Sequence, residues 1–372
     1  FAGNIRTLLD GLESGVAMTA VVKANAYGHG APAMARTAIE AGANRLAVAT
    51  VGEGRQLRRA DVAAPIVALG AIDPAEAPAA VALSLELMVG TETLLAAVER
   101  AAADAPEPLA MHVLVDTGLR RYGAMPELAI ALARRIAAHP NLRLQGLATH
   151  FATSEDAGDT FADEQRDLLL RVVDALAREG IAPATVHMAN SGALLRGSAF
   201  HADAVRGGIA IYGIAPSIDR PLPGGVRPAL TLHSRVQRVF DLASGDTVGY
   251  GRTLKVERPM RAALVPIGYA DGYRRQLANH AWMIVGGERA PLLGRVSMDQ
   301  AVVAAPGGVD VQVGTEVIVA GGDPALGAPS MDDLGAMVGT NSYEMLTGIS
   351  ARVPRHYVRA GEVVEIAEMA TS

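Results

Sequence analysis

Lysine is rare in this chain, and one of its lysines stands where an amine could do chemistry. Of the 33 basic residues in the 372-residue sequence, only Lys23 and Lys255 are lysines. Unlike an arginine guanidinium, a lysine amine can lose its proton and attack a carbonyl carbon. Lys23 directly follows the apolar run 18–22, which is typical of a buried strand. The position therefore predicts a nucleophilic amine, with a solvated strand end as the alternative.

The residues after Lys23 indicate a sharp turn close to a ligand. Residues 24–30 are mostly small and include two glycines, so the backbone can bend tightly and approach a bound molecule. Residues 31–41 then have a helical pattern that ends at Gly42. Lys23 is thus expected where a strand ends and a loop begins. In α/β folds, ligands bind outside the carboxyl ends of strands.

The first two thirds of the chain alternate between short apolar runs and helical stretches rich in Ala, Leu and Arg. The strand candidates are residues 19–23, 45–49, 65–69, 85–89, 110–115, 143–149, 185–188 and 204–206. Eight strand–helix units within about 200 residues predict an α/β fold, specifically a (β/α)8 TIM barrel. An open doubly wound sheet is the alternative, but it usually has fewer strands and a glycine-rich first turn. No G-x-G-x-x-G pattern follows the first predicted strand.

Polar residues gather at the predicted carboxyl ends of these strands, as a barrel enzyme requires. They are Lys23 and residues 116–121, 149–151, 187–192 and 205–209. The loops after the last two strands of such a barrel usually hold a phosphate group. Ser191 offers a hydroxyl there, and Gly208 and Ile209 offer backbone N–H groups that can converge on an anion. A helix N-cap is the alternative role for Ser191.

The last third of the chain has a different pattern. A Pro- and Gly-rich segment, residues 216–228, ends the alternation and predicts two domains, residues 1–222 and 223–372. Beyond it, the β-like runs are residues 234–242, 261–267, 282–285, 301–304 and 316–320, with one helix at 331–338. The barrel is therefore expected to be followed by a mostly β C-terminal domain.

Composition and charge exclude several classes of protein. The net charge of −6 gives no basic signature for nucleic acid. No uninterrupted apolar segment is long enough to span a membrane and no signal peptide is visible, so we expect a cytoplasmic protein. The absence of cysteine excludes disulfides, catalytic thiols and cysteine–metal sites, and no metal is expected. Because the chain starts at Phe1, we expect some N-terminal residues to be missing.

One decapeptide around Lys23 resembles the pyridoxal-phosphate attachment motif of bacterial alanine racemases: Val21-Val22-Lys23-Ala24-Asn25-Ala26-Tyr27-Gly28-His29-Gly30. The resemblance implies that Lys23 bonds covalently to pyridoxal 5′-phosphate and that Tyr27 contacts its phosphate group. The further cofactor contacts that it implies come from Asn190, Ser191, Gly208 and Ile209.

Arg206 is the next most informative residue. In the family that the chain resembles, an arginine at this place faces the pyridine nitrogen of the cofactor, and the resemblance implies that His150 supports it. Arginine does not give up its proton, so it leaves that nitrogen unprotonated. The ring is then a weaker electron sink than one facing a carboxylate, which disfavours transamination and decarboxylation.

Four motifs in the last third resemble the same family, at residues 248–251, 268–272, 294–299 and 341–344. The resemblance thus covers almost the whole chain, in order. It implies a homodimer with shared active sites, in which Tyr250 of the partner subunit is the second catalytic base beside Lys23. It places Met298 and Asp299, also from the partner, on the substrate side. Tyr269 lies on the way in, and Tyr343 narrows the entrance near the phosphate. A β-sheet aromatic with a satisfied hydroxyl is the alternative for each tyrosine.

Arg121 marks a departure from the family pattern. It resembles the family arginine that reaches the cofactor's phenolic oxygen and the substrate carboxylate. Many relatives carry, seven residues earlier, a lysine modified to a carbamate that braces this arginine, whereas this chain has Leu114. No carbamate can form on leucine, so Arg121 must be held in another way. Its neighbour Arg120 is an alternative for the same role.

The resemblance as a whole implies an isomerase that interconverts L-alanine and D-alanine by a two-base mechanism and supplies D-alanine for peptidoglycan. A racemase of another or broader amino-acid range, for example one acting on serine, is the main alternative. A barrel-fold pyridoxal-phosphate decarboxylase fits less well, because such enzymes resemble one another in using a carboxylate opposite the pyridine nitrogen and a cysteine as proton donor. This chain offers Arg206 and has no cysteine. A non-catalytic cofactor-binding barrel would lack the β domain.

Overall fold

The computed structural model describes residues 1–368, and the chain divides into two compact units. The first unit comprises Phe1–Ala26 and Ala31–Val226, and the second comprises Tyr27–Gly30 and the chain from Arg227 onward. The strand that leads to Lys23 and the three residues after the lysine therefore belong to the first unit, while the next four residues, Tyr27–Gly30, belong to the second. The predicted domain boundary between residues 222 and 223 stays a prediction.

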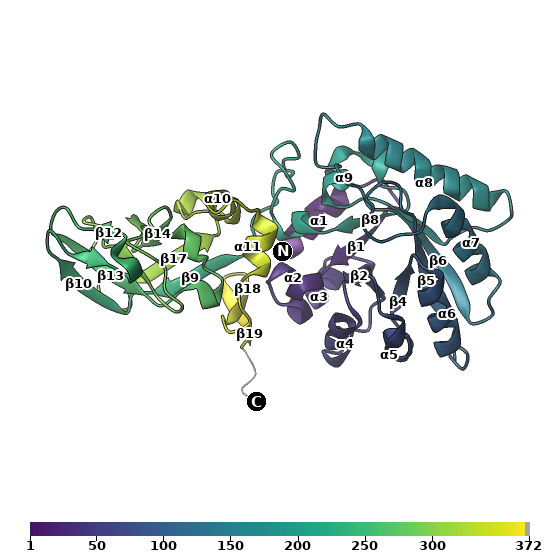
Figure 1. The fold of residues 1–372 in the computed structure, drawn as a ribbon, viewed down its shortest axis with the longest axis horizontal. Helices are drawn as coiled ribbons and strands as arrows, with labels where there is room; N and C mark the ends of the chain where they lie inside the picture. The colour runs from purple at the N-terminus through teal and green to yellow at the C-terminus, as the bar shows by residue number, and fades with distance from the viewer. Residues whose placement is uncertain (369–372) are drawn as a thin grey trace. The chain divides into compact units, whose positions relative to one another are not determined.

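The first unit is a closed barrel of parallel strands, which confirms the expected fold class (Figure 1). Its strands are β1 (Ala17–Val21), β2 (Arg45–Val48), β3 (Ile66–Ala68), β4 (Glu86–Val89), β5 (Leu109–Leu114), β6 (Leu142–Ala148), β7 (Thr185–His187) and β8 (Ala204–Gly207). The barrel closes where β1 pairs with β8, with Met18 opposite Val205. All residues of β4, β5 and β8 are buried, since helices cover the outside and side chains fill the inside.

Helices surround this barrel (Figure 1). They are α1 (Ala2–Asp10), α3 (Ala31–Glu40), α4 (Val51–Arg59), α5 (Ala77–Ala82), α6 (Glu92–Ala101), α7 (Pro126–Ala137), α8 (Phe161–Ala177) and α9 (Ser191–Arg196). Helix α6 illustrates why they form: the Thr91 side chain caps it by accepting a hydrogen bond from the Leu94 N–H, and its buried face is apolar. Within residues 1–368, no helix combines the length and apolar character needed to cross a membrane.

The second unit is mostly antiparallel β-structure, as expected. Its strands are β9 (Thr231–Arg235), β10 (Arg238–Leu242), β11 (Thr247–Val248), β12 (Leu254–Lys255), β13 (Met260–Val265), β14 (Trp282–Val285), β15 (Glu288–Pro291), β16 (Ala301–Ala304), β17 (Glu316–Gly321), β18 (Arg355–Arg359) and β19 (Glu362–Ala367). They form a three-stranded sheet in the order β10-β13-β16, a four-stranded sheet in the order β15-β14-β17-β9, and two hairpins. Two helices accompany them, α10 (Met331–Met337) and α11 (Ser342–Thr347).

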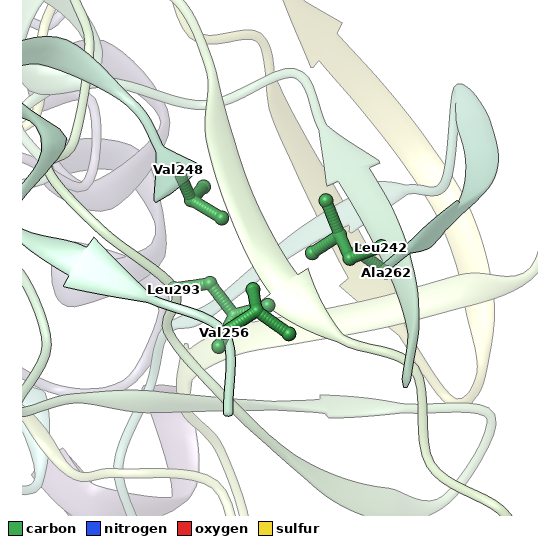
Figure 2. Close-up of a cluster of buried hydrophobic side chains, with 5 residues drawn as sticks. All are labelled: Leu242, Val248, Val256, Ala262 and Leu293. Carbon is green, nitrogen blue, oxygen red and sulfur yellow. The ribbon is translucent and has the colours of Figure 1, made fainter. Parts of the chain in front are cut away.

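Short 3₁₀ turns complete the two units. They are η1 (Pro74–Glu76), η2 (Ser198–Phe200), η3 (Ile209–Tyr212), η4 (Tyr250–Arg252), η5 (Tyr269–Asp271), η6 (Arg275–Leu277) and η7 (Pro324–Leu326). In the second unit, a small apolar core lies between the strands and the loops that join them (Figure 2). It consists of Leu242, Val248, Val256, Ala262 and Leu293. This core holds the strand that leads into the Tyr250 turn, because Val248 is one of its members.

The prediction of one strand over residues 234–242 is wrong. The chain leaves β9 at Arg235 and enters β10 at Arg238, because its hydrogen-bond partner changes there. The Val236 N–H donates to Thr315, beside β17, whereas the Gln237 N–H donates to Leu264 in β13. The expectation of one helix in this unit is also incomplete, since Asn341 caps a second helix, α11, by accepting a hydrogen bond from Glu344.

The turn after Lys23 has an unusual backbone. In α2 (Lys23–Tyr27), Ala24, Asn25 and Ala26 have φ between 51° and 54° and ψ between 45° and 52°, so the turn is left-handed. Each such non-glycine residue costs about 1–2 kcal/mol relative to a right-handed conformation. The Asn25 side chain offsets part of this by accepting a hydrogen bond from the Ala31 N–H at 2.9 Å. The turn sends the chain sharply away from the barrel strand.

Arg355 fixes the segment beyond this turn within the second unit. Its guanidinium donates two hydrogen bonds to the Gly28 carbonyl, at 3.1 and 3.0 Å, and others to carbonyls of its own loop. Gly28 has φ +82°, and a Cβ there would lie 2.1 Å from the Leu346 carbonyl oxygen. Glycine is therefore required at this position by both backbone conformation and close approach.

We expect Gly28→Ala to destabilise the protein much more than Gly15→Ala. Gly15 also has positive φ (+91°), but a Cβ there would meet nothing within 4 Å. Gly15→Ala should therefore lose about 1 kcal/mol from the backbone conformation alone. Gly28→Ala should lose roughly 1–3 kcal/mol more, because the added methyl displaces backbone. Thermal unfolding of the two variants measures the difference, and equal melting temperatures would show that Leu346 does not confine Gly28.

Candidate active site

Lys23 lies at the carboxyl end of β1 and is half-buried. Burial lowers the pKa of its amine, and so do the positive charges of Arg121 and Arg206, while Glu53 partly opposes them. A lowered pKa increases the fraction of neutral amine, which is the nucleophilic form. The position and the electrostatic environment of Lys23 therefore suit an amine that bonds to a carbonyl carbon.

Glu53 holds the backbone around Lys23, and sequence analysis did not identify it. Its carboxylate accepts hydrogen bonds from the N–H groups of Ala24 and Ala49, both at 2.7 Å. It also completes a capping box with Thr50 at the start of α4. The Thr-x-x-Glu spacing is a sequence signal for that helix cap, but nothing in the spacing points to Ala24.

Arg206 is buried among fixed hydrogen-bond acceptors. Its Nη1 donates to Nδ1 and to the carbonyl of His187, at 3.1 and 3.0 Å. Its Nη2 donates to the Thr149 carbonyl at 2.8 Å, to the Met188 carbonyl at 3.0 Å and to His150 Nδ1 at 3.2 Å. The Nε–H has no acceptor among residues 1–368. All four Nη protons thus donate to protein acceptors. The Nε–H, which stays protonated, can donate to a ligand.

His150 lies beside Arg206, as sequence analysis expected. Because arginine can only donate, His150 must accept at Nδ1 and carry its proton at Nε2. Burial lowers the pKa of His150 well below its ordinary value, and the positive charges of Arg206, Arg121 and Lys23 act in the same direction. His150 is therefore a neutral imidazole with an Nε2–H donor.

The Ser191 hydroxyl joins the loops after β7 and β8. Its Oγ accepts hydrogen bonds from the N–H groups of Gly208 at 3.0 Å and Ala210 at 3.2 Å. With both lone pairs used, its proton is left to donate to a ligand. Ile209 is buried between these two donors. Ser191 is not the N-cap of α9, because Asn190 takes that role by accepting from the Ala193 N–H at 3.0 Å.

Arg121 lies on the loop after β5 and is exposed. It makes no hydrogen bond or ion pair within the described part of the chain, whereas Arg120 forms an ion pair with Asp116. Leu114 is buried against Met88 and Ala148. No polar group at residue 114 braces Arg121, so its guanidinium is available to an anionic ligand.

Gln165 is a second residue that sequence analysis missed. This fully buried side chain of α8 donates to Thr117 Oγ1 at 3.1 Å and to the His150 carbonyl at 3.2 Å. It also accepts from the Ala152 N–H at 2.9 Å. One amide thus ties together the loops after β5 and β6. A lone glutamine in an amphipathic helix carries no sequence signal for this role.

The other predicted site residues lie in the second unit. Tyr250, Tyr269 and Met298 are exposed by 71, 42 and 52 %. The motifs of Tyr269 and Met298 lie side by side, because the Ala270 N–H donates to the Met298 carbonyl. Asp299 accepts a hydrogen bond from Arg352 at 2.7 Å. Tyr269, Met298 and Asp299 therefore lie together on an accessible surface that carries a phenol, a thioether and a carboxylate.

Tyr27 and Tyr343 face each other within the second unit. Their ring centroids lie 6.1 Å apart with an interplanar angle of 56°. Burial raises the pKa of Tyr27 to about 12, so its hydroxyl is protonated at neutral pH and can donate to an anion. In the described residues, no group of three or more His, Cys, Asp and Glu side chains could hold a metal ion.

The first unit can hold a ligand that carries an aldehyde, a phosphate and a ring nitrogen. The Lys23 amine suits the aldehyde, and the Ser191 hydroxyl suits the phosphate. The Arg206 Nε–H suits an unprotonated ring nitrogen, because a protonated nitrogen would meet a cation there. Pyridoxal 5′-phosphate combines these three groups in one molecule.

Two family models match the chain. "Alanine racemase, N-terminal domain" matches residues 1–216, and "Alanine racemase, C-terminal domain" matches residues 229–357. The curated alanine racemase of Symbiobacterium thermophilum is 39% identical over 342 residues, which are 91% of this chain and 90% of the relative. The alanine racemase of Geobacillus stearothermophilus is 39% identical over 373 residues, 98% of this chain and 92% of the relative.

Solved structures agree over nearly the full length. The crystal structure of alanine racemase from Bacillus anthracis with bound L-Ala-P is similar, with a TM-score of 0.91 and 36% identity over 99% of this chain and 95% of that chain. Alanine racemase from Streptomyces coelicolor has a TM-score of 0.89 and 33% identity over 95% of this chain and 94% of that chain.

Proposed function

This chain belongs to the alanine racemase family, and on that premise we propose that it interconverts L-alanine and D-alanine with pyridoxal 5′-phosphate as cofactor. The observation that carries this proposal is the environment of Arg206, whose Nη protons are all bound while its Nε–H is left for the ring nitrogen. When bound, the cofactor supplies a conjugated ring that withdraws electrons from the substrate's α-carbon.

Racemisation requires a proton-transfer group on each face of that carbon. We assign one face to the Lys23 amine, because its lowered pKa increases the fraction of neutral amine, the form that can accept a proton. We assign the other face to Tyr250 of the partner subunit. In each direction, one group removes the α-proton and the conjugate acid of the other returns a proton. Tyr250 is 71% exposed in one chain, which supports its use by a second chain.

Arg206 favours racemisation over other reactions of the same cofactor. A guanidinium cannot pass its proton to the ring nitrogen, so the ring remains a weak electron sink. A carboxylate at the same place would hold that nitrogen protonated and spread charge into the ring, which helps transamination and decarboxylation. The absence of cysteine also argues against the decarboxylases, which use a cysteine proton donor.

The remaining site residues receive binding roles in this proposal. Tyr27, Ser191, Gly208 and Ile209 contact the phosphate, Asn190 is a further cofactor contact, and Tyr343 narrows the entrance near the phosphate. Arg121 binds the substrate carboxylate, and its lack of a hydrogen bond or ion pair to any of residues 1–368 supports that role. His150 keeps Arg206 in place. Tyr269, Met298 and Asp299 border the route of the substrate.

We further propose the setting in which the enzyme works. It acts as a homodimer with shared active sites, in the cytoplasm, and supplies D-alanine for peptidoglycan. The boundary between the two domains lies between residues 222 and 223 of the sequence, inside the Pro- and Gly-rich segment.

Isotope exchange tests the activity. Incubation of the loaded enzyme with L-alanine in deuterated water should give D-alanine and α-deuterated alanine, measured by chiral chromatography and mass spectrometry. Lys23→Ala should lose at least a thousandfold in rate, because one base is removed. Lys255→Ala is the matched control and should keep the wild-type rate, since Lys255 is exposed and has no role in the proposed reaction. Serine as a faster substrate would favour the broader racemase, and carbon dioxide release would contradict the proposal.

Mixed dimers test the shared site. Lys23→Ala and Tyr250→Phe should each be nearly inactive alone. If the two bases come from different chains, a mixed dimer has one site with both changes and one intact site. With random mixing about half the dimers are mixed, so co-refolding equal amounts should restore roughly a quarter of wild-type activity. If activity stays at the level of the separate variants, the bases belong to one chain and the shared site is wrong.

A further inference from the structure

A continuous row of polar side chains crosses the inside of the barrel. It runs from Arg206 in β8, through His187 at the end of β7 and His112 in the middle of β5, to Glu86 and Arg45, the first residues of β4 and β2. Because the strands are parallel, the row starts near the carboxyl end, where Lys23 lies, and finishes at the amino end. A barrel interior is normally filled by apolar side chains, so this row needs an explanation.

The hydrogen bonds of the row can point in only one direction. Arg206 Nη1 donates to His187 Nδ1, so His187 must carry its proton at Nε2. That Nε2 lies 2.9 Å from His112 Nδ1, which must therefore accept and leave the His112 proton at Nε2. The His112 Nε2–H then donates to Glu86 Oε2 at 2.9 Å. Every donor thus faces away from Arg206 and toward the Glu86 carboxylate.

The charges agree with this direction. Burial lowers the pKa of His112 and that of His187, so both imidazoles are neutral, although Glu86 opposes the shift at His112. Burial alone would raise the pKa of Glu86, but its contacts with His112 and Arg45 lower it, so the carboxylate is ionised. Arg45 Nε lies 2.6 Å from Glu86 Oε2 and balances the charge. Glu86 is the carboxylate that terminates the row.

We propose that Glu86 is a positioning residue for Arg206, which acts through the fixed tautomers of His112 and His187. The inference rests on the proposed function, in which the Arg206 Nε–H meets the cofactor's ring nitrogen. A chain of hydrogen bonds that ends on a carboxylate is polarised along its length, so each acceptor nitrogen becomes more electron-rich. His187 Nδ1 thereby binds Arg206 Nη1 more strongly and fixes the direction of Nε–H. The charge at the amino end of the barrel therefore controls a donor near its carboxyl end.

The experiment uses the cofactor-loaded enzyme labelled with ¹⁵N-histidine. In the wild type, His112 and His187 should each be protonated at Nε2 only. In Glu86→Gln the amide oxygen can still accept from His112, but the charge is lost. The Nε2–H proton signals of both histidines should then move upfield, since both hydrogen bonds weaken. The kcat for alanine should fall roughly tenfold with KM changed less than twofold, because one charge-assisted interaction is lost.

Two control variants separate this role from a structural one. Arg45→Met breaks the same ion pair but keeps Glu86 bound to His112, so it should lower stability without the upfield shift at His187. Glu99→Gln removes another carboxylate that pairs with an arginine, Arg135, and should leave both histidine signals and kcat unchanged. If Glu86→Gln and Arg45→Met behave alike, Glu86 is only structural.

Other outcomes would also overturn the proposal. A proton on Nδ1 of either histidine in the wild type would show that the hydrogen bonds do not run from Arg206 toward Glu86. An unchanged His187 signal in Glu86→Gln would show that the charge of Glu86 does not affect His187. These signals are measured without turnover, so they test the row even if the wild type fails to racemise alanine. The measurement of the two wild-type tautomers needs no variant, so it tests the direction of the hydrogen bonds even if Glu86→Gln does not fold.

Discussion

The left-handed turn after Lys23 is the constraint on which the rest of the site depends. Ala24, Asn25 and Ala26 all have φ near 50°, at a cost of about 1–2 kcal/mol each. Such strain persists only where the surroundings over-determine the conformation. Here the Glu53 carboxylate holds the Ala24 N–H, and Asn25 holds the Ala31 N–H. The turn therefore ends the strand abruptly and leaves the lysine amine at the carboxyl end of the barrel.

The site that this turn completes is cationic before any ligand binds. Burial and the charges of Arg121 and Arg206 lower the pKa of Lys23, and burial with the same kind of charges keeps His150 neutral. A cofactor with a phosphate and a substrate with a carboxylate supply the missing negative charge. Five acceptor atoms bind the Nη protons of Arg206, and its Nε–H has no acceptor in the part of the chain that the structure describes. Charge balance and hydrogen-bond geometry thus select the same kind of ligand.

Most strands of the barrel could be predicted from the sequence, because buried parallel strands are apolar runs and polar or charged residues follow them at their carboxyl ends. Lys23 and Arg206 were predictable for that reason. The roles of Glu53, Gln165 and Glu86 were not predictable. Each depends on a contact with a residue that lies between 26 and 48 positions away in the sequence. The left-handed turn could not be predicted either, since alanine ordinarily favours a right-handed backbone. The run 234–242 was misread because its sheet partner changes midway, which local pattern does not reveal.

Covalent trapping tests most directly whether Lys23 carries the cofactor. Borohydride reduction of the loaded enzyme makes the bond between cofactor and lysine permanent, and proteolysis with mass spectrometry then locates it. The chain offers only two lysines, so the answer is unambiguous. We expect the mass of the reduced cofactor on the peptide that contains Lys23. A label on the peptide that contains Lys255 instead would show that Lys23 does not carry the cofactor.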